Sequence, residues 1–506
     1  MSEPATLGYF VNGKSELSTT EKYYDITDPN TGEVIAKSPC CTVDEVNRAV
    51  ESAQNAFPAW RDTPVMARVQ VMYRFKRILE ENIDALTMSV CRENGKVWGE
   101  ARGDVRKALE VVELACGAPS LMMGNSLMDT SRNYDTVMYR ESLGVFAGLV
   151  PWNFPAMIPF GWMVPLCIAT GNTMVLKASS TTPMTALMIV EMLHEAGLPE
   201  GVVNVMTCSR HEAELFLKHP DVKGITFVGS TSVGKHIYST AAAHGKRLQT
   251  LCEAKNHCLV LEDAPIERTA AGIVNATYGC AGERCMALPV VVVQESIADK
   301  LVAAIKRMAE QRVIGPSYDK TSELGPVVTA EHKKFVLDWI EKGIAEGATL
   351  VLDGRSASVD GYDDGYWIGP TIFDHVTPEM SVGDEEIFGP VTCIKRVKDF
   401  EEGIRLMNAN RFANGSAIYT QNGYFSREFA RRTDAGMVGI NVGIPVPVGL
   451  FPFSGHKNSF FGDLHVMGSD GVRFYTETKC VTTHWFDEEE MKQKKVDTWD
   501  GTIGKI

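Results

Sequence analysis

The chain has 506 residues and a net charge of −14. This length is too great for one hydrophobic core and suits two or three globular domains. The acidic charge disfavours nucleic-acid binding over the general surface, and no apolar run approaches the roughly 20 residues that span a bilayer. The start, MSEPATLGYFVNGK, has no signal-peptide or transit-peptide pattern, and the twelve cysteines form no C-x-x-C pair. We therefore expect a cytoplasmic protein with reduced thiols, no nucleic-acid or membrane partner and no metal site.

Helical and strand patterns alternate along the chain. Apolar spacing of three and four predicts amphipathic helices over 43–60, 65–82 and 101–115. Short apolar runs then predict strands within GVFAGLVPW (144–152), at 171–176 and at 202–206, with helices over 159–170 and 183–196 between them. After a strand at 225–228 and a following helix, a second series predicts strands near 259–261, 289–294, 349–352 and 391–396, and helices near 297–312 and 330–346. Two α/β domains are the simplest interpretation.

Two polar, β-prone stretches, 125–139 and 472–485, interrupt this alternation. Because they do not fit a buried parallel sheet, we expect strands that pair with another subunit. The charged residues from Asp487 onward predict a terminal tail.

Cys285 is the candidate nucleophile. It ends the turn-forming stretch Gly282-Glu283-Arg284-Cys285, where a thiolate beside Arg284 and backbone N–H groups is expected to have a lowered pKa. The alternative is a buried structural cysteine, which is what most cysteines are.

The segment Pro151-Trp152-Asn153-Phe154-Pro155 places one amide between two prolines in an apolar setting. Asn153 can donate to an oxyanion, an interaction worth roughly 3–4 kcal/mol in acyl transfer. The alternative is an asparagine that caps a turn.

Two further motifs suggest cofactor contacts. Gly229 and Ser230 open a helix after a strand, where backbone N–H groups attract phosphate, although a plain strand-to-helix turn explains them as well. In Glu385-Glu386-Ile387-Phe388-Gly389-Pro390, a carboxylate can bind ribose hydroxyls, or the pair of glutamates can form a solvated acidic turn.

Together, in this order and spacing, these motifs resemble the aldehyde dehydrogenase superfamily over essentially the whole chain. The resemblance implies that Cys285 is the nucleophile, that Asn153 donates to the oxyanion, and that Gly229 and Ser230 lie by the cofactor diphosphate. It further implies that the cofactor contacts four more residues: Trp152, Lys177 in VLKASS, Glu386 and Phe388.

The implied fold is α/β, aldehyde dehydrogenase-like, with two Rossmann-like domains and a β-flap for oligomerisation. We predict an NAD(P)-binding domain over 1–121 and 143–251, a catalytic domain over 252–467, a flap over 122–142 and 468–490, and a C-terminal tail over 491–506. A homodimer or homotetramer is expected.

A narrower resemblance is to methylmalonate-semialdehyde dehydrogenases, the coenzyme A-acylating branch. It rests on CGAPSLMMG, PWNFPAMIPFGWMVPL, AKNH, GERCMAL and NVGIPVPV with FSGHKNSFFGD and GVRFYTETK. The hydrolytic relatives carry a glutamate base in E-L-G-G-K, and here Leu251 occupies that position. Since the thiol of coenzyme A needs less help from a base than water does, thiolysis of the enzyme thioester is expected. If methylmalonate semialdehyde is the substrate, the resemblance implies release of CO2 and propionyl-CoA.

Three departures leave alternatives open. Glu253, two residues after Leu251, is either a replacement base for hydrolysis or a loop carboxylate. In the relatives, two arginines hold the substrate carboxylate. Arg284 matches the first, but the second position falls on Lys107, beside Arg106. Another aldehyde is therefore possible as substrate.

The usual K-P-S-E segment reads Lys177-Ala178-Ser179-Ser180, which lacks the glutamate that repels a 2′-phosphate. With Ser180 there, NADP is expected to be accepted beside NAD.

The sequence thus predicts NAD(P)-dependent oxidation of a small semialdehyde through a Cys285 thioester, with coenzyme A as co-substrate. The alternatives are a hydrolytic semialdehyde dehydrogenase that releases the free acid, and a non-catalytic family member. The sequence leaves open the aldehyde, the preferred dinucleotide, the acyl acceptor, dimer or tetramer, and the physiological direction.

Overall fold

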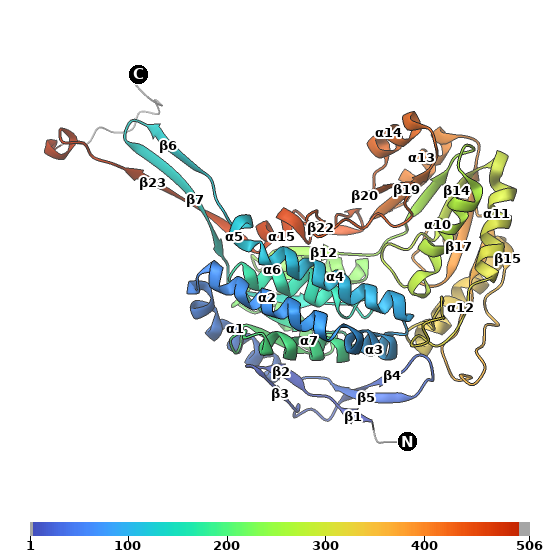
Figure 1. Ribbon diagram of the computed structural model, residues 1–506, viewed down its shortest axis with the longest axis horizontal. Coiled ribbons are helices and arrows are strands. Elements are labelled where there is room, and N and C mark those ends of the chain that lie inside the picture. Colours follow the sequence, from blue (N-terminus) through green and yellow to red (C-terminus); the bar gives the residue numbers. More distant parts are fainter. Residues whose placement is uncertain (1–3, 495–506) are drawn as a thin grey trace.

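The computed structural model describes residues 4–494, and two large α/β sheets make up most of it (Figure 1). Of the predicted tail, 495–506 lie outside the described residues. None of the helices in 4–494 combines the length and apolar character needed to cross a bilayer.

The first sheet has eight strands in the order β22-β12-β11-β8-β9-β10-β2-β3. Its five central strands are parallel, and β2 and β22 join the two sides antiparallel. Its strands are β2 (Tyr9–Val11), β3 (Lys14–Glu16), β8 (Val145–Leu149), β9 (Thr173–Lys177), β10 (Val203–Met206), β11 (Val222–Val228), β12 (Arg247–Leu251) and β22 (Phe460–Gly462). The predicted division at residue 251 assigns β22 to the second domain, yet β22 pairs with β12, because the chain returns to this edge after completing the second sheet.

The helices around the first sheet are α1 (Val43–Asp62), α2 (Val65–Glu81), α3 (Ile83–Asn94), α4 (Trp98–Cys116), α5 (Ala118–Leu121), α6 (Val164–Ala169), α7 (Met184–Glu195), α8 (Arg210–Lys218), α9 (Thr231–Ala242) and α15 (Gly468–Phe474). Helix α1 begins with a capping box, in which Thr42 accepts from the Glu45 N–H and Glu45 accepts from the Thr42 N–H. The helix predicted over 159–170 is divided into a π-helical segment, Ile158–Met163, and α6.

The second sheet has seven strands in the order β15-β16-β17-β14-β13-β19-β20, parallel except for β15 at one edge. Its strands are β13 (His257–Val260), β14 (Val290–Gln294), β15 (Thr349–Leu352), β16 (Thr371–Asp374), β17 (Val391–Val397), β19 (Gly415–Tyr419) and β20 (Met437–Ile440). Its helices are α10 (Ile266–Tyr278), α11 (Glu295–Glu310), α12 (Ala330–Ala345), α13 (Phe400–Ala409) and α14 (Gly423–Arg432). Each face of the sheet packs on its own apolar cluster.

Three small sheets complete the fold. One contains β1 (Ala5–Thr6), β4 (Tyr23–Thr27) and β5 (Val34–Pro39), and one pairs β18 (Phe412–Ala413) with β21 (His456–Lys457). The third contains β6 (Ser126–Ser131), β7 (Tyr134–Ser142) and β23 (Thr476–His484), and it projects from the body as an arm (Figure 1). The strand prediction over 472–485 was wrong at its start, because Val472 packs into the core as part of α15 before β23 begins.

The parallel order of the first sheet positions the site. The segments that follow β8, β9, β11 and β12 all leave the same edge of the sheet, since the carboxyl ends of parallel strands point the same way. The motifs around Asn153, Lys177, Ser230 and Glu253 therefore meet at this edge, although more than 20 residues separate each from the next.

Candidate active site

Cys285 lies in a turn that the backbone holds in an unusual shape. Cys280, Ala281 and Gly282 all have left-handed φ values, 52°, 52° and 77°. A Cβ at Gly282 would overlap the carbonyl oxygen of Gly389, so a glycine is needed where this loop meets the EEIFGP segment. This close approach brings the Cys285 turn against the predicted cofactor residues.

Two amides fix the backbone of the candidate nucleophile. Asn256 Nδ2 donates to the Cys285 carbonyl oxygen at 2.8 Å, and Asn414 Nδ2 donates to the same oxygen at 3.1 Å. Both residues lie next to strands of the second sheet, which therefore anchors the turn. Asn256 belongs to the AKNH segment quoted above, but nothing in the sequence indicates that it bonds to Cys285, 29 residues away.

Asn153 lies beside the same turn. Its Nδ2 donates to the backbone oxygen of Glu283 at 3.2 Å, and its Oδ1 is buried without a partner among the described residues. Lys96 donates to the backbone oxygen of Asn153 and lies 3.0 Å from Asp104, which in turn accepts from the Met157 N–H at 2.7 Å. A buried ion pair thus supports the loop that carries the candidate oxyanion donor, a role that the sequence interpretation did not assign to Lys96.

The expectation of a lowered pKa at Cys285 is wrong for this structure. The pKa of the thiol is raised to about 12, mainly by burial and next by the nearby Glu386, and Arg284 lowers it by less. The cause is tertiary, because segments distant in the sequence pack around the half-buried Cys285 side chain.

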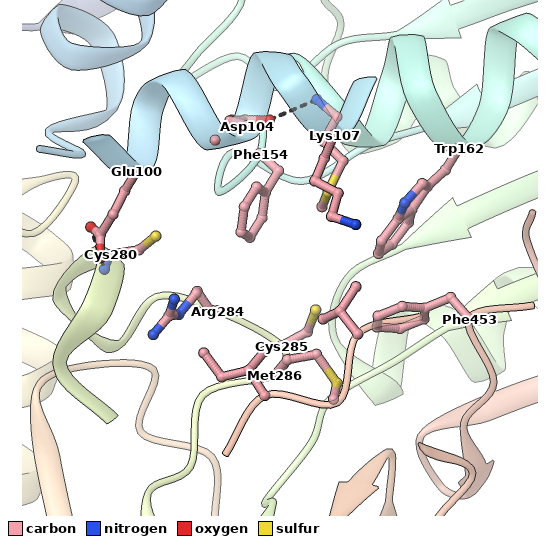
Figure 2. A pocket seen from close by; sticks show the side chains of 14 residues that line it. Glu100, Asp104, Lys107, Phe154, Trp162, Cys280, Arg284, Cys285, Met286 and Phe453 are labelled. Carbon is pink, nitrogen blue, oxygen red and sulfur yellow. Dashed lines mark hydrogen bonds between the residues drawn. The ribbon is translucent and has the colours of Figure 1, made fainter. Parts of the chain in front are cut away.

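A cavity of about 370 Å³ opens above Cys285 (Figure 2). Helix α4 contributes Glu100, Gly103, Asp104 and Lys107 to the lining. Arg284 and Cys285 lie across the cavity from Asp104 and Lys107, and Cys280 lies beside Glu100, to which its N–H donates at 2.6 Å. The remaining wall is apolar and consists of Phe154, Met157, Trp162, Met286, Ile444, Val446 and Phe453. This volume and lining suit a small molecule with a short polar group.

The two predicted carboxylate-binding residues both line this cavity, but each already has partners. Arg284 Nη2 donates to the backbone oxygens of Asn275 and Ala276, at 2.7 and 3.1 Å, and its Nε is buried without a partner among the described residues. Lys107 Nζ lies 2.7 Å from Glu110. Arg106 is exposed and is not part of the lining.

Aromatic side chains cluster beside Glu386. Trp152 meets Phe388 edge to face at a centroid distance of 5.4 Å, and His332 lies 5.3 Å from Trp152. Phe388 has a left-handed φ of 57°, and its carbonyl oxygen is 2.7 Å from His332 Nε2. The pKa of Glu386 is raised to about 8, mainly by burial, although the Ala254 N–H, which donates to its Oε1 at 3.1 Å, lowers it; Glu253 adds a smaller increase.

Leu251 and Glu253 have different surroundings. Leu251 ends β12 and belongs to the apolar core, so it supplies no base. Glu253 Oε2 accepts from the Thr231 N–H at 3.0 Å, at the N-terminus of α9 that Gly229 and Ser230 precede. Its carboxylate is therefore turned toward the helix terminus, where the helix dipole favours a negative charge.

Another cavity, of about 210 Å³, lies at the carboxyl ends of the central strands of the first sheet, between α8 and α9. Lys177 lines it, and burial lowers the pKa of this lysine. Ser180 is partly exposed and is not part of the lining. The structure instead places Arg210, Glu214 and His236 there, which the sequence interpretation did not single out.

Comparison with known proteins identifies the class of protein that has this fold and site. The aldehyde dehydrogenase family model matches residues 16–481, and the chain belongs to this family. It is 47% identical to malonate-semialdehyde dehydrogenase 3 of Geobacillus kaustophilus, over 96% of this chain and all of that protein.

Two solved structures agree closely in fold. A methylmalonate-semialdehyde dehydrogenase of Oceanimonas doudoroffii superposes with a TM-score of 0.94 at 40% identity, over 96% of this chain and 100% of that one. A Sinorhizobium meliloti protein assigned to the same activity, in complex with NAD, also gives 0.94, at 39% identity over 96% and 99%. The predicted family, fold class and likeness to this branch are confirmed.

Proposed function

We propose that the enzyme oxidises a small semialdehyde with NAD(P) and passes the acyl group to coenzyme A. The observation that carries this proposal is the surroundings of Cys285: a small cavity, an adjacent amide from Asn153, and Leu251 where a hydrolytic base would stand. The names of the relatives, malonate- and methylmalonate-semialdehyde dehydrogenases, support the same chemistry.

In the proposed reaction, the Cys285 thiol releases its proton to solvent, Sγ bonds to the aldehyde carbon, and the carbonyl oxygen becomes an oxyanion. Asn153 Nδ2 and the Cys285 N–H stabilise this charge, which requires the amide to exchange its 3.2 Å bond to the Glu283 oxygen for one to the oxyanion. When bound, NAD(P) accepts the hydride that leaves this carbon. The product is a thioester on Cys285. The sulfur of coenzyme A then bonds to the acyl carbon, the bond from this carbon to Sγ breaks, and the proton of the coenzyme A thiol restores the Cys285 thiol.

The residues present fit a dinucleotide. Glu386 can accept from ribose hydroxyls beside the aromatic pair Trp152 and Phe388, and Lys177 lines a cavity at the carboxyl edge of the parallel strands, where open α/β sheets bind nucleotides. Gly229 and Ser230 are proposed to lie by the diphosphate.

We propose a carboxylate on the aldehyde because Arg284 and Lys107 line the cavity as cations. Malonate and methylmalonate semialdehydes meet this requirement. The arm of β6, β7 and β23 exposes Leu127, Met128 and Val481, and we propose that it joins subunits in a homodimer or homotetramer.

The test measures NAD(P)H formation from malonate semialdehyde with and without coenzyme A. Without the thiol we expect a burst of about one NAD(P)H per active site and then a slow phase, because deacylation is blocked. Addition of coenzyme A should restore continuous turnover. A full steady rate without coenzyme A would contradict the acylating proposal.

The hydrolytic alternative has its own control. If Glu253 activates water, Glu253→Gln should abolish the slow phase; we expect it to persist, because the Glu253 carboxylate is bonded to the Thr231 N–H. The non-catalytic alternative predicts that Cys285→Ala changes nothing, whereas our proposal predicts loss of the burst.

A further inference from the structure

Glu110 connects two parts of the active-site cavity. Lys107 reaches from α4 into the cavity (Figure 2), and Glu110 lies one helical turn further along α4, behind the lining. One carboxylate oxygen of Glu110, Oε2, lies 2.7 Å from the Lys107 ammonium. The other oxygen, Oε1, accepts from the backbone N–H of Gly449. A single carboxylate therefore joins a cation of the cavity to a segment 339 positions away in the chain.

The segment 444–453 forms part of the apolar wall of the cavity, to which it contributes Ile444, Val446 and Phe453. Within 444–452, the hydrogen bonds to other described parts of the chain are both made by Gly449. Its N–H donates to Glu110, and its carbonyl oxygen accepts from the Gly468 N–H at 3.0 Å. The side chains around Gly449 are exposed and add little packing, namely Val448, Leu450 and Phe451. The position of this wall therefore depends on Glu110.

The charge of Lys107 is divided between Glu110 and any carboxylate that enters the cavity. An ammonium concentrates its charge at one nitrogen, so an anion bound there reduces the attraction that a second anion meets. The two side chains are 38% and 34% exposed, and ion pairs so close to solvent are weak. A substrate carboxylate can therefore compete with Glu110 for Lys107.

We propose that Glu110 is a positioning residue that sets how strongly the enzyme prefers aldehydes that carry a carboxylate. Through Oε2 it lowers the positive charge that Lys107 offers to such a substrate. Through Oε1 it holds the cavity wall that every aldehyde contacts. Loss of the charge alone therefore favours carboxylated aldehydes, whereas loss of the anchor impairs all aldehydes. This inference rests on the proposed oxidation of a small semialdehyde and names a residue that tunes substrate choice in the same site.

The experiment compares kcat/KM for malonate semialdehyde with kcat/KM for propanal, which has similar size and no carboxylate, at saturating dinucleotide and coenzyme A. Glu110→Gln removes the charge but keeps an oxygen that can accept from the Gly449 N–H. It should lower the KM for malonate semialdehyde about two- to fivefold and leave both constants for propanal within twofold. Glu110→Ala removes the anchor too, and kcat/KM should fall about tenfold or more for both aldehydes.

Two further variants test whether Glu110 acts through Lys107. Lys107→Met/Glu110→Gln should have the same ratio of the two kcat/KM values as Lys107→Met alone, because the ammonium that carries the effect is absent. Glu113→Gln is the matched control. Glu113 is an exposed carboxylate on the same helix, it does not line the cavity, and its loss should leave the ratio unchanged.

Three results would overturn the inference. They are an unchanged ratio in Glu110→Gln, the same rise of the ratio in the Lys107→Met background, and wild-type kcat/KM for both aldehydes in Glu110→Ala. If Glu110→Ala does not fold, Glu110→Gln and the double variant still decide. None of these results would affect the proposed function, since the wild type would still form NAD(P)H from malonate semialdehyde. A wild type that oxidises neither aldehyde would instead refute the proposed function.

Discussion

Lys96 offers the sharpest test of how the site is built. Its Nζ lies 3.0 Å from Asp104 Oδ2, and the two side chains are 2% and 0% exposed. The same ammonium donates to the Asn153 backbone oxygen and lies 3.5 Å from the ring centroid of Phe154. One buried charge therefore connects α4 to the loop that carries the candidate oxyanion donor.

Lys96→Met keeps most of the apolar stem and removes the charge. Because breaking a buried pair leaves its partner uncompensated, the expected loss is about 3–5 kcal/mol of unfolding free energy. We expect the lower end, since Asp104 keeps its bond from the Met157 N–H. The kcat should fall roughly 10- to 100-fold, less than the 10²–10³ expected when an oxyanion donor is deleted, because the Asn153 amide is displaced rather than removed.

The double variant Lys96→Met/Asp104→Asn separates the two effects. With both charges gone, no unpaired ion remains buried, so stability should return to within about 1–2 kcal/mol of the wild type. The kcat defect should persist, because the donor to the Asn153 oxygen is still missing. Urea unfolding followed by fluorescence and steady-state NAD(P)H formation measure the two quantities. The reasoning is refuted if the single variant is as stable as the wild type, or if the double variant regains full kcat.

Two further outcomes are expected. Asn153→Ala should lower kcat roughly 10²- to 10³-fold with little change in KM, since its amide is proposed to act on the transition state; an equal rise in KM with constant kcat in steady-state assays would show a binding role instead. Because burial raises the pKa of Glu386 to about 8, its carboxyl is protonated in the free enzyme below that pH and accepts ribose hydroxyls poorly. The kcat/KM for the dinucleotide should therefore rise as the pH increases through about 8. A pH profile of Glu386→Gln should lack this step, and a step that remains would assign it to another group.

The sequence by itself determined part of the elements and the family; it missed, for example, α10, α13 and β19. Periodicity located α1 and α2 to within two residues at each end, and the strand patterns placed β8, β9 and β10, because local apolar spacing reports directly which face a segment buries. Motif order was sufficient to recognise the aldehyde dehydrogenase family, since each motif combines unusual residues at a fixed separation.

Only the tertiary structure decided what surrounds the reactive groups. Asn414 and Cys285 are 129 positions apart, and Glu253 and Thr231 are 22 apart, and the sequence carries no signal that these groups bond to each other. The raised pKa of Cys285 follows from burial by distant segments, and the place of Arg210 in a cavity lining follows from how α8 packs against β11 and α9. Such contacts depend on how whole elements pack, and the spacing of residues along one segment contains no information about the distance between two.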